Sequence, residues 1–463
     1  DHRVSASRLQ DRCAGAAMNA RRSCLLLLLL QLAGCAVYQP APLPSPDLEP
    51  RSLAELVVAP RAHPLLASAP VDLAAPLGEW DLARITLAIS PDLAALRSQA
   101  DVAEAQLFAS GLLPDPQLSV GLGNPSGAGL VTVLSGALAI ELSSLLTRAP
   151  RQDVARANVE AAHHDLGWRE WLTINQVRTL VRRIDALQHQ RSFATDASEL
   201  ARKRLALDRD NLALGDARID DVSLSQIAFV DAQDRALALS LVLRSTQLQL
   251  TALVGLSPRV ELTLAPAEPA EDGRACDVVP ILSARALASR LDLMALRDGY
   301  QAQEAQLHAA TRAALPLPQL SLSRDRDSGA IWTSGATATL ALPLWNRGRG
   351  DIAVAQATRT QLAAEYRARV HQMNADIAAL CVDLDALTQQ REALAVELPS
   401  LREAGARLAS ASGEGGVSRV SFEAVRAALL DKELTLLGID QARSEAQVAL
   451  ETAVGEFIGK DRP

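Results

Sequence analysis

Four segments of the chain alternate between apolar residues and small or polar ones, which is the pattern of β-strands whose two faces meet different surroundings. The first segment, QLSVGLGN at residues 117–124, is followed by a turn-forming Asn-Pro-Ser-Gly and then by a second alternating segment. Two more segments occur about 200 residues later, on either side of the polar stretch RDRDSG. The predicted apolar faces are Leu118, Val120 and Leu122; Leu138, Ile140 and Leu142; Leu320 and Leu322; and Leu340, Leu342 and Leu344.

Long helices are predicted between and after these strand pairs. From Ile377 to Leu408, apolar residues recur at steps of 3, 4 and 7, which is a coiled-coil heptad. The same phase occurs 200 residues earlier, from Val177 to Leu187. We expect rods of about 60 residues, each about 90 Å long. The predicted helices are 90–110, the rods 153–212 and 351–411, and the return helices 221–254 and 421–454.

A tandem duplication underlies this order of elements. The stretch DLAALRSQADVAEAQL at residues 92–107 returns as DLMALRDGYQAQEAQL at residues 292–307, without a gap. LPDPQLS and LPLPQLS also form a pair, each preceding a predicted strand. We therefore divide the chain into a first repeat, a linker, a second repeat and a tail. Their bounds are 80–255, 256–280, 281–457 and 458–463.

The N-terminal region has the pattern of a bacterial lipoprotein signal peptide. Two arginines follow Met18, then comes an apolar run too short to cross a membrane, and then Leu-Ala-Gly-Cys, which resembles a lipobox. We predict an upstream extension at 1–17, a signal peptide at 18–34, acylation of Cys35 and an extended lead at 35–79. Ala36, rather than Asp, after the acylated residue points to the outer membrane. Cys276 and Cys381 are expected to be unpaired.

Composition and charge narrow the functional classes. Apolar residues make up 49% of the chain and aromatic ones only 3%, a balance that favours long helices. The net charge of -8 argues against nucleic acid as a partner, because phosphate binding requires a basic face. The sequence has no catalytic triad and no metal-protease or Cys-x-x-Cys pattern. We therefore expect no enzyme activity, no metal and no cofactor other than the covalent lipid.

Strands with one apolar face suit a wall between lipid and water. Four strands cannot close a transmembrane barrel, and an open edge in lipid leaves backbone groups unpaired at several kcal/mol each. Several chains must therefore share one barrel. The predicted fold class is mainly α with a small β part: antiparallel coiled-coil helices form an α-barrel, and three chains supply a 12-stranded transmembrane β-barrel.

This order of elements, given twice behind a lipobox, resembles the TolC-type outer-membrane factor family. The likeness extends over residues 80–457 and is carried by SPDLAAL, by LPDPQLS and LPLPQLS, and by LALPLWNRGRGDIAVAQA at residues 340–357. The resemblance implies a homotrimer in the outer membrane, extending into the periplasm as a passive duct. It also implies two partners, a periplasmic adaptor and an inner-membrane pump of the resistance-nodulation-division type.

The resemblance further implies two kinds of site near the periplasmic end. Adaptor-docking tips fall on Leu214, Gly215, Asp216 and Ala217 and on Gly415, Gly416, Val417 and Ser418. The acidic candidates for a narrow periplasmic aperture are Asp220, Asp221 and Glu423. Each of these residues can also be explained more simply, as part of a turn or of a solvated helix face.

Two other functions remain open from the sequence. The duct could serve type I secretion of polypeptides. The chain could also be a lipid-anchored coiled-coil scaffold that conducts nothing, although the alternating strands argue against a scaffold, which has no use for them. The cargo of the duct is not encoded in any motif.

Overall fold

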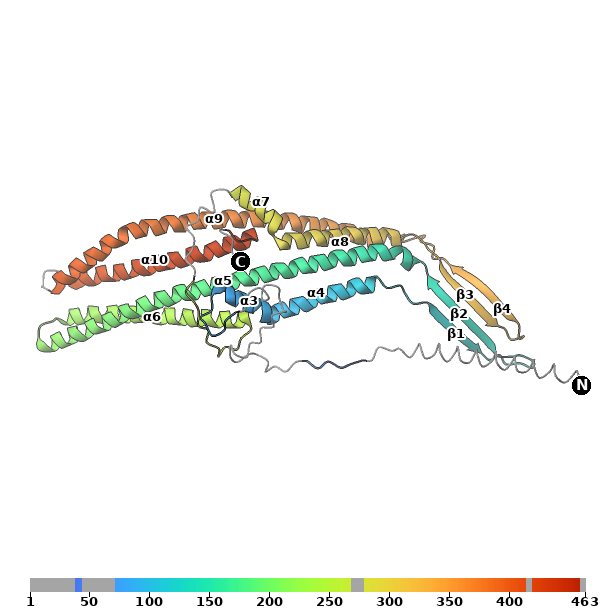
Figure 1. Ribbon diagram of the computed structural model, residues 1–463, viewed down its shortest axis with the longest axis horizontal. Coiled ribbons are helices and arrows are strands. Elements are labelled where there is room, and N and C mark those ends of the chain that lie inside the picture. The colour runs from blue at the N-terminus through green and yellow to red at the C-terminus, as the bar shows by residue number, and fades with distance from the viewer. Residues whose placement is uncertain (1–37, 44–70, 268–278, 414–418, 459–463) are drawn as a thin grey trace, which may run out of the picture. The chain divides into compact units, whose positions relative to one another are not determined.

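The computed structural model describes residues 38–43, 71–267, 279–413 and 419–458. The chain divides into a unit of residues 1–49 and a unit of residues 50–463, and every helix and strand named below belongs to the second. That unit is mainly helical with one small antiparallel sheet, so the predicted fold class is confirmed (Figure 1). The sheet lies at one end of the unit, and the C-terminal ends of α5 and α9, with the starts of α6 and α10, lie at the other.

The elements follow one another in the same order twice. The first series is α3 (Glu79–Ile89), α4 (Pro91–Ser110), β1 (Gln117–Gly123), β2 (Val133–Glu141), α5 (Ser143–Leu214) and α6 (Ile219–Val254). The second is α7 (Val279–Ser289), α8 (Leu291–Ala313), β3 (Gln319–Arg326), β4 (Trp332–Thr339), α9 (Arg349–Gly413) and α10 (Arg419–Val454). Equivalent helices begin about 200 residues apart. The short helices α3 and α7 were not predicted, and Asp81 caps the first by accepting the Gly78 backbone N–H at 3.2 Å.

The fourth strand lies earlier in the chain than predicted. The expected strand with Leu340, Leu342 and Leu344 is wrong, because β4 ends at Thr339. Its partner β3 begins at Gln319, which pairs with Thr339, so no strand is available to pair with the later leucines. Leu142 is likewise not in β2, which ends at Glu141.

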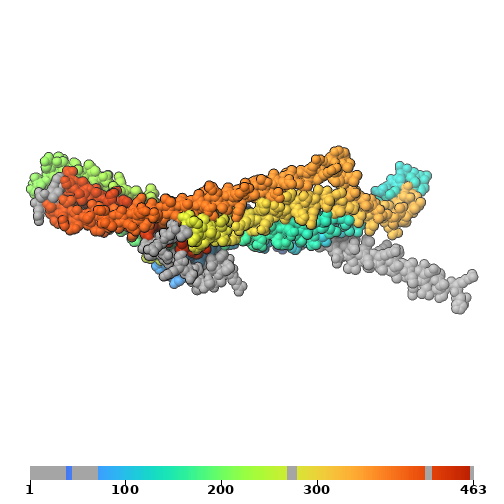
Figure 2. All heavy atoms as spheres, turned by 90° about the horizontal axis from the view of Figure 1, so that it is seen from above, coloured from blue at the N-terminus to red at the C-terminus, as the bar shows by residue number. Residues whose placement is uncertain are grey.

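The two long rods are more continuous than the sequence suggested. Helix α5 has 72 residues and α9 has 65, which correspond to about 108 Å and about 98 Å. Each contains a proline, Pro150 near the start of α5 and Pro399 in α9. Helix α5 is covered by other helices along its length. Helix α6 packs along its C-terminal half, and α4 and α8 pack along its N-terminal half, next to the sheet (Figure 1). Figure 2 shows α8, in yellow, between α9 and α5.

Each repeat has its own apolar core, and the two cores use equivalent positions. The first is built around α3, α5 and α6, and the second around α7, α9 and α10. The heptad residues Val177 and Ile377 are both fully buried. The other equivalent pairs are Leu82 and Leu282, Val181 and Cys381, Leu250 and Leu450, and Val254 and Val454. The repeat is therefore preserved in packing as well as in sequence.

A buried group of charges joins the first repeat to the last helix. Arg182 on α5 binds both carboxylate oxygens of Glu79 on α3, at 2.8 and 3.0 Å. Arg178 on α5 donates to Glu79 at 3.4 Å and to Glu451 on α10 at 2.6 Å. Its guanidinium lies 4.7 Å from the ring centre of Trp80. Because these ions are desolvated, they fix α3, α5 and α10 in one arrangement. We name Glu79, Arg178, Arg182 and Glu451 the buried charge cluster.

One cysteine prediction is wrong. Cys381 is buried in the second core and takes part in a disulfide bond, whereas the sequence led us to expect an unpaired thiol. Its partner lies outside the described residues. So does Cys35, and its acylation therefore stays a prediction.

Candidate functional site

The four strands form one antiparallel sheet in the order β1-β2-β3-β4. Residues paired across neighbouring strands share a face, so the register defines the two surfaces. Leu118, Leu138 and Leu322 form one such row, and Ser119, Ala137 and Ser323 form the next row, on the opposite face. We call the surface that carries the leucine row the leucine face of the sheet, and the other its small-residue face.

The leucine face is open to its surroundings. Leu118, Val120 and Leu122 are each about 70% exposed, at 69%, 73% and 74%. An apolar surface of this kind on an isolated sheet requires a cover, either lipid or another protein. The opposite face carries mainly Ser, Thr, Gly, Ala and Gln, together with Val133, Glu141 and Asp325, and is therefore largely small and polar.

Both edges of the sheet are unpaired within the described part of the chain, because β1 and β4 are each bonded to a single neighbour. The strands contain 7 to 9 residues. This is at or slightly below the 9 to 11 residues of a transmembrane strand. An apolar face together with two free edges defines a fragment of a wall, not a closed barrel.

Helix α6 is the other large apolar surface. It is long and apolar enough to cross a membrane by length and composition, and little of that apolar stretch is buried. The exposed side chains include Ile227, Leu237 and Leu241. Helix α6 packs antiparallel along α5 and ends beside α3, so α5 and α6 form a hairpin. Its apolar face is therefore largely uncovered in the part of the chain that the structure describes.

At the end of the first hairpin, the turn is built from the predicted tip residues. Leu214 ends α5, and Gly215 has a φ of 85°, a left-handed conformation that glycine adopts without strain. The Asp216 N–H then donates to the Asn211 carbonyl at 2.8 Å, which closes the helix end. Leu214 and Ile219 project from this turn and are 75% and 70% exposed. The turn therefore exposes two apolar side chains.

The second predicted tip, Gly415, Gly416, Val417 and Ser418, lies outside the described residues. The helices that flank it are joined to each other, because Arg402 on α9 binds Glu433 on α10 through two bonds of 2.5 and 2.8 Å. Docking at either tip stays a prediction.

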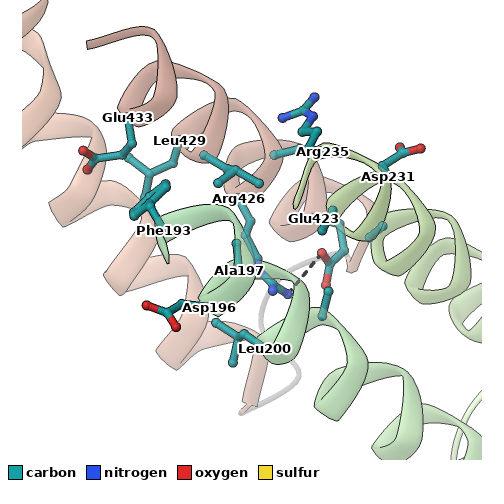
Figure 3. Close-up of a pocket in the computed structure, with 15 residues that line it drawn as sticks. Phe193, Asp196, Ala197, Leu200, Asp231, Arg235, Glu423, Arg426, Leu429 and Glu433 are labelled. Atoms are coloured by element: carbon teal, nitrogen blue, oxygen red, sulfur yellow. Dashed lines mark ion pairs between the residues drawn. The ribbon is translucent and has the colours of Figure 1, made fainter. Parts of the chain in front are cut away.

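Between the two hairpins lies a groove of about 430 Å³ (Figure 3). The hairpins α5–α6 and α9–α10 both contribute to it, with apolar side chains in the middle and charged ones around them. Its labelled lining residues are Phe193, Asp196, Ala197 and Leu200 from α5, Asp231 and Arg235 from α6, and Glu423, Arg426, Leu429 and Glu433 from α10. The sequence did not single out this groove, because its residues are up to 240 positions apart.

The three predicted acidic residues have different environments. Glu423 lines the groove, pairs with Arg426 at 3.6 Å and is 14% exposed at its side chain (Figure 3). Asp220 pairs with Arg218 at 3.1 Å and is 59% exposed. Asp221 accepts the Arg218 backbone N–H at 3.1 Å, which caps α6. The structure therefore gives Asp221 a clear role in the helix start, and the aperture role of all three stays a prediction.

No group of three or more His, Cys, Asp and Glu residues in the described ranges could hold a metal ion.

An open sheet with one apolar face, joined to two long helical hairpins, can be compared with known proteins as a fold. Residues 282–456 match the family model described as outer membrane efflux protein. A search of curated proteins found no match.

Solved structures show the same fold over nearly the whole chain. CusC matches with a TM-score of 0.71 and 17% identity, over 91% of this chain and 99% of that one. VceC of Vibrio cholerae matches with a TM-score of 0.67 and 16% identity, over 82% and 96%. The CmeC outer membrane channel of Campylobacter jejuni matches with a TM-score of 0.68 and 15% identity, over 83% and 87%.

The resemblance to the TolC-type outer-membrane factor family is thereby confirmed: the second repeat matches the family model, and both repeats have the family's fold.

Proposed function

We propose that three copies of this chain form one outer-membrane duct, which passively conducts substrates from an inner-membrane pump through a periplasmic adaptor. The observation that carries the proposal is the open four-stranded sheet with its exposed leucine face. In lipid, each unpaired backbone group costs several kcal/mol, so the edges of β1 and β4 must bond to other chains. Three chains supply twelve strands, an even number within the range of known barrels.

The helical part supports the same assembly. The exposed apolar side chains of α6, such as Leu237 and Leu241, would pack against a helix of the neighbouring chain. The periplasmic helices would then form a closed wall below the barrel. The hairpin turn at Gly215 and the groove beside Glu423 would lie at its far end, where an adaptor can reach them.

The direct test is conductance of the purified full chain in planar lipid bilayers, together with its mass in detergent. We expect a trimer and discrete channel openings. A monomer without conductance would contradict the duct and would favour the scaffold. Reconstitution with candidate adaptors would then separate small-molecule efflux from polypeptide export, because the two kinds of system use different adaptors and pumps.

Membrane anchoring through Cys35 forms a separate part of this proposal. The lipobox supports it, and mass spectrometry of the mature N-terminal peptide tests it. An unmodified Cys35 in membrane-extracted protein would remove the anchor and leave the duct unaffected.

A further inference from the structure

Two arginines interrupt the leucine face of the sheet near its end. By the register, Arg326 lies in one row with Leu122, Leu134 and Trp332. Arg324 lies in the adjacent row on the same face, opposite Gly136 and Ser334. Both rows belong to the end of the sheet that is farthest from the helices (Figure 1). The leucine face is therefore apolar over most of its height and basic at its outer end.

Neither arginine has an acidic partner on its own face within the described residues. Asp325 lies on the opposite face, in a row with Ser135 and Thr333. Asp327, in the turn, already accepts the backbone N–H groups of Gly329 and Ile331 through one carboxylate oxygen, at 2.8 and 2.9 Å. In the part of the chain that the structure describes, the Nε of Arg326 is buried without a hydrogen-bond partner.

The geometry of the pair suits a phosphate ligand. Residues two apart on a strand lie about 7 Å from each other and point the same way. The Arg324 guanidinium lies 5.3 Å from the ring centre of Trp332, which holds it against the sheet. A guanidinium binds phosphate oxygens through two parallel N–H bonds, and it keeps its charge at the edge of an apolar region. Trp332 beside it is 52% exposed and suits the boundary between lipid and water.

We propose that Arg324 and Arg326 form a binding site for the phosphates of an anionic lipid headgroup in the outer leaflet of the membrane. The inference rests on the proposed function, because it requires that the sheet spans the membrane with its helices on the periplasmic side. The continuous apolar surface below the arginines accommodates the acyl chains of the same lipid molecule. A trimer would carry three such sites around its barrel.

The test uses the full chain in detergent and native mass spectrometry of its lipid adducts. The probes are a bisphosphorylated disaccharide lipid, zwitterionic phosphatidylethanolamine and inorganic phosphate. We expect the wild-type protein to prefer the bisphosphorylated lipid. The variant R324Q/R326Q should bind that lipid at least about tenfold more weakly, since two charge-assisted contacts are lost. R324K/R326K keeps the charge and should lie between the two.

The control variant R191Q/R202Q removes the same charge from exposed positions on α5, and it should bind like wild type. Equal lipid binding by R324Q/R326Q and wild type would overturn the inference, as would an equal loss in the control. Competition by inorganic phosphate at the concentration of the lipid would overturn the assignment to a lipid. Bilayer conductance separates a failure of the lipid site from a failure of the duct. If wild type forms channels but R324Q/R326Q binds lipid as wild type does, only the lipid site is refuted. If wild type forms no channels, the duct is refuted.

Discussion

The substitution Glu79→Gln tests whether the buried charge cluster stabilises the junction of the two repeats. It preserves the shape of the side chain and removes its charge. Arg182 then loses its ionic bonds of 2.8 and 3.0 Å, and Arg178 loses one of 3.4 Å. The side chains of Glu79 and Arg182 are each only 3% exposed, so water does not replace these contacts.

The expected cost follows from what remains in the cluster. Removing one partner of a buried ion pair costs about 3 to 5 kcal/mol. Arg178 keeps Glu451 at 2.6 Å and Asn175 at 2.8 Å, so most of the lost ionic contact is that of Arg182, which keeps a bond to Ser444 at 3.4 Å. We therefore expect a loss near the lower limit, about 3 kcal/mol.

The assay is urea unfolding followed by helical circular dichroism, at fixed protein and detergent concentrations because assembly contributes to stability. The matched control is Glu104→Gln, whose partner His163 lies at 3.1 Å in a largely exposed pair. Exposed pairs contribute about 0 to 1 kcal/mol. A loss in Glu79→Gln no larger than that in the control would refute the reasoning.

Acid provides a second check on the same variant. Burial acts to raise the pKa of Glu79, but the hydrogen bonds and charges of Arg182 and Arg178 outweigh it and lower the pKa below its ordinary value of 4.5. A carboxyl group with a lowered folded-state pKa stabilises the fold above its unfolded pKa, and this contribution is lost as the pH falls through the folded pKa. The difference between wild type and Glu79→Gln should therefore be complete at pH 7 and shrink below pH 4.5. A difference that stays constant with acidification would show that charge is not its cause.

Three further predictions address the turn, the sheet and the aperture. Gly255→Ala should lower the stability against urea more than Gly215→Ala does. Both positions have a left-handed backbone, which costs alanine about 1 to 2 kcal/mol. Only at Gly255 would the new Cβ also clash, because it would lie 2.7 Å from Pro91. Equal losses would contradict this. Leu322→Arg should lower the yield of trimer in outer membranes, because placing a charge against lipid costs about 2 to 4 kcal/mol. Ser323→Arg, on the opposite face, should insert normally. Similar yields for the two variants would contradict the assignment of faces. Glu423→Ala should reduce cation selectivity in planar bilayers, and an unchanged conductance and selectivity would remove Glu423 from the aperture candidates.

The strands show why part of the fold was accessible from sequence and part was not. In β1, β2 and β3, leucines alternate with small residues, so the period is visible in the chain itself. In β4, WTSGATAT, the leucine-face positions after Trp332 are Ser334, Ala336 and Ala338, and no apolar period results. The following leucines do alternate, but a strand also needs a partner, and β3 extends only to Gln319 at that end. The register that excludes them depends on pairing, which local patterns do not contain.

The candidate site divides in the same way. Gly215 was placed in the turn after the first rod, and the structure has it there with a φ of 85°, which glycine adopts without strain. The groove between the hairpins was not predicted, since Phe193 on α5 meets Glu423 and Leu429 on α10 only in the folded chain. The buried arginines Arg178 and Arg182 were hidden for another reason: on a helix of mixed composition, a charged residue that faces inward has the same local pattern as one that faces water.

The buried charge cluster has no counterpart at the equivalent positions of the other repeat. At the positions 200 residues away, Glu79, Arg178 and Arg182 correspond to Val279, Ala378 and Val382, and Glu451 corresponds to Thr251. The cluster joins α5 to α10 within one chain. In the trimer proposed above, the equivalent junction would join α9 to the α6 of a neighbouring chain. Apolar and small side chains suit that junction, because a monomer awaiting assembly can leave Val382 in water without holding an unpaired ion. Each repeat thus has its own core built from equivalent positions, and in the proposed trimer the junctions differ because one would form when the chain folds and the other when chains meet.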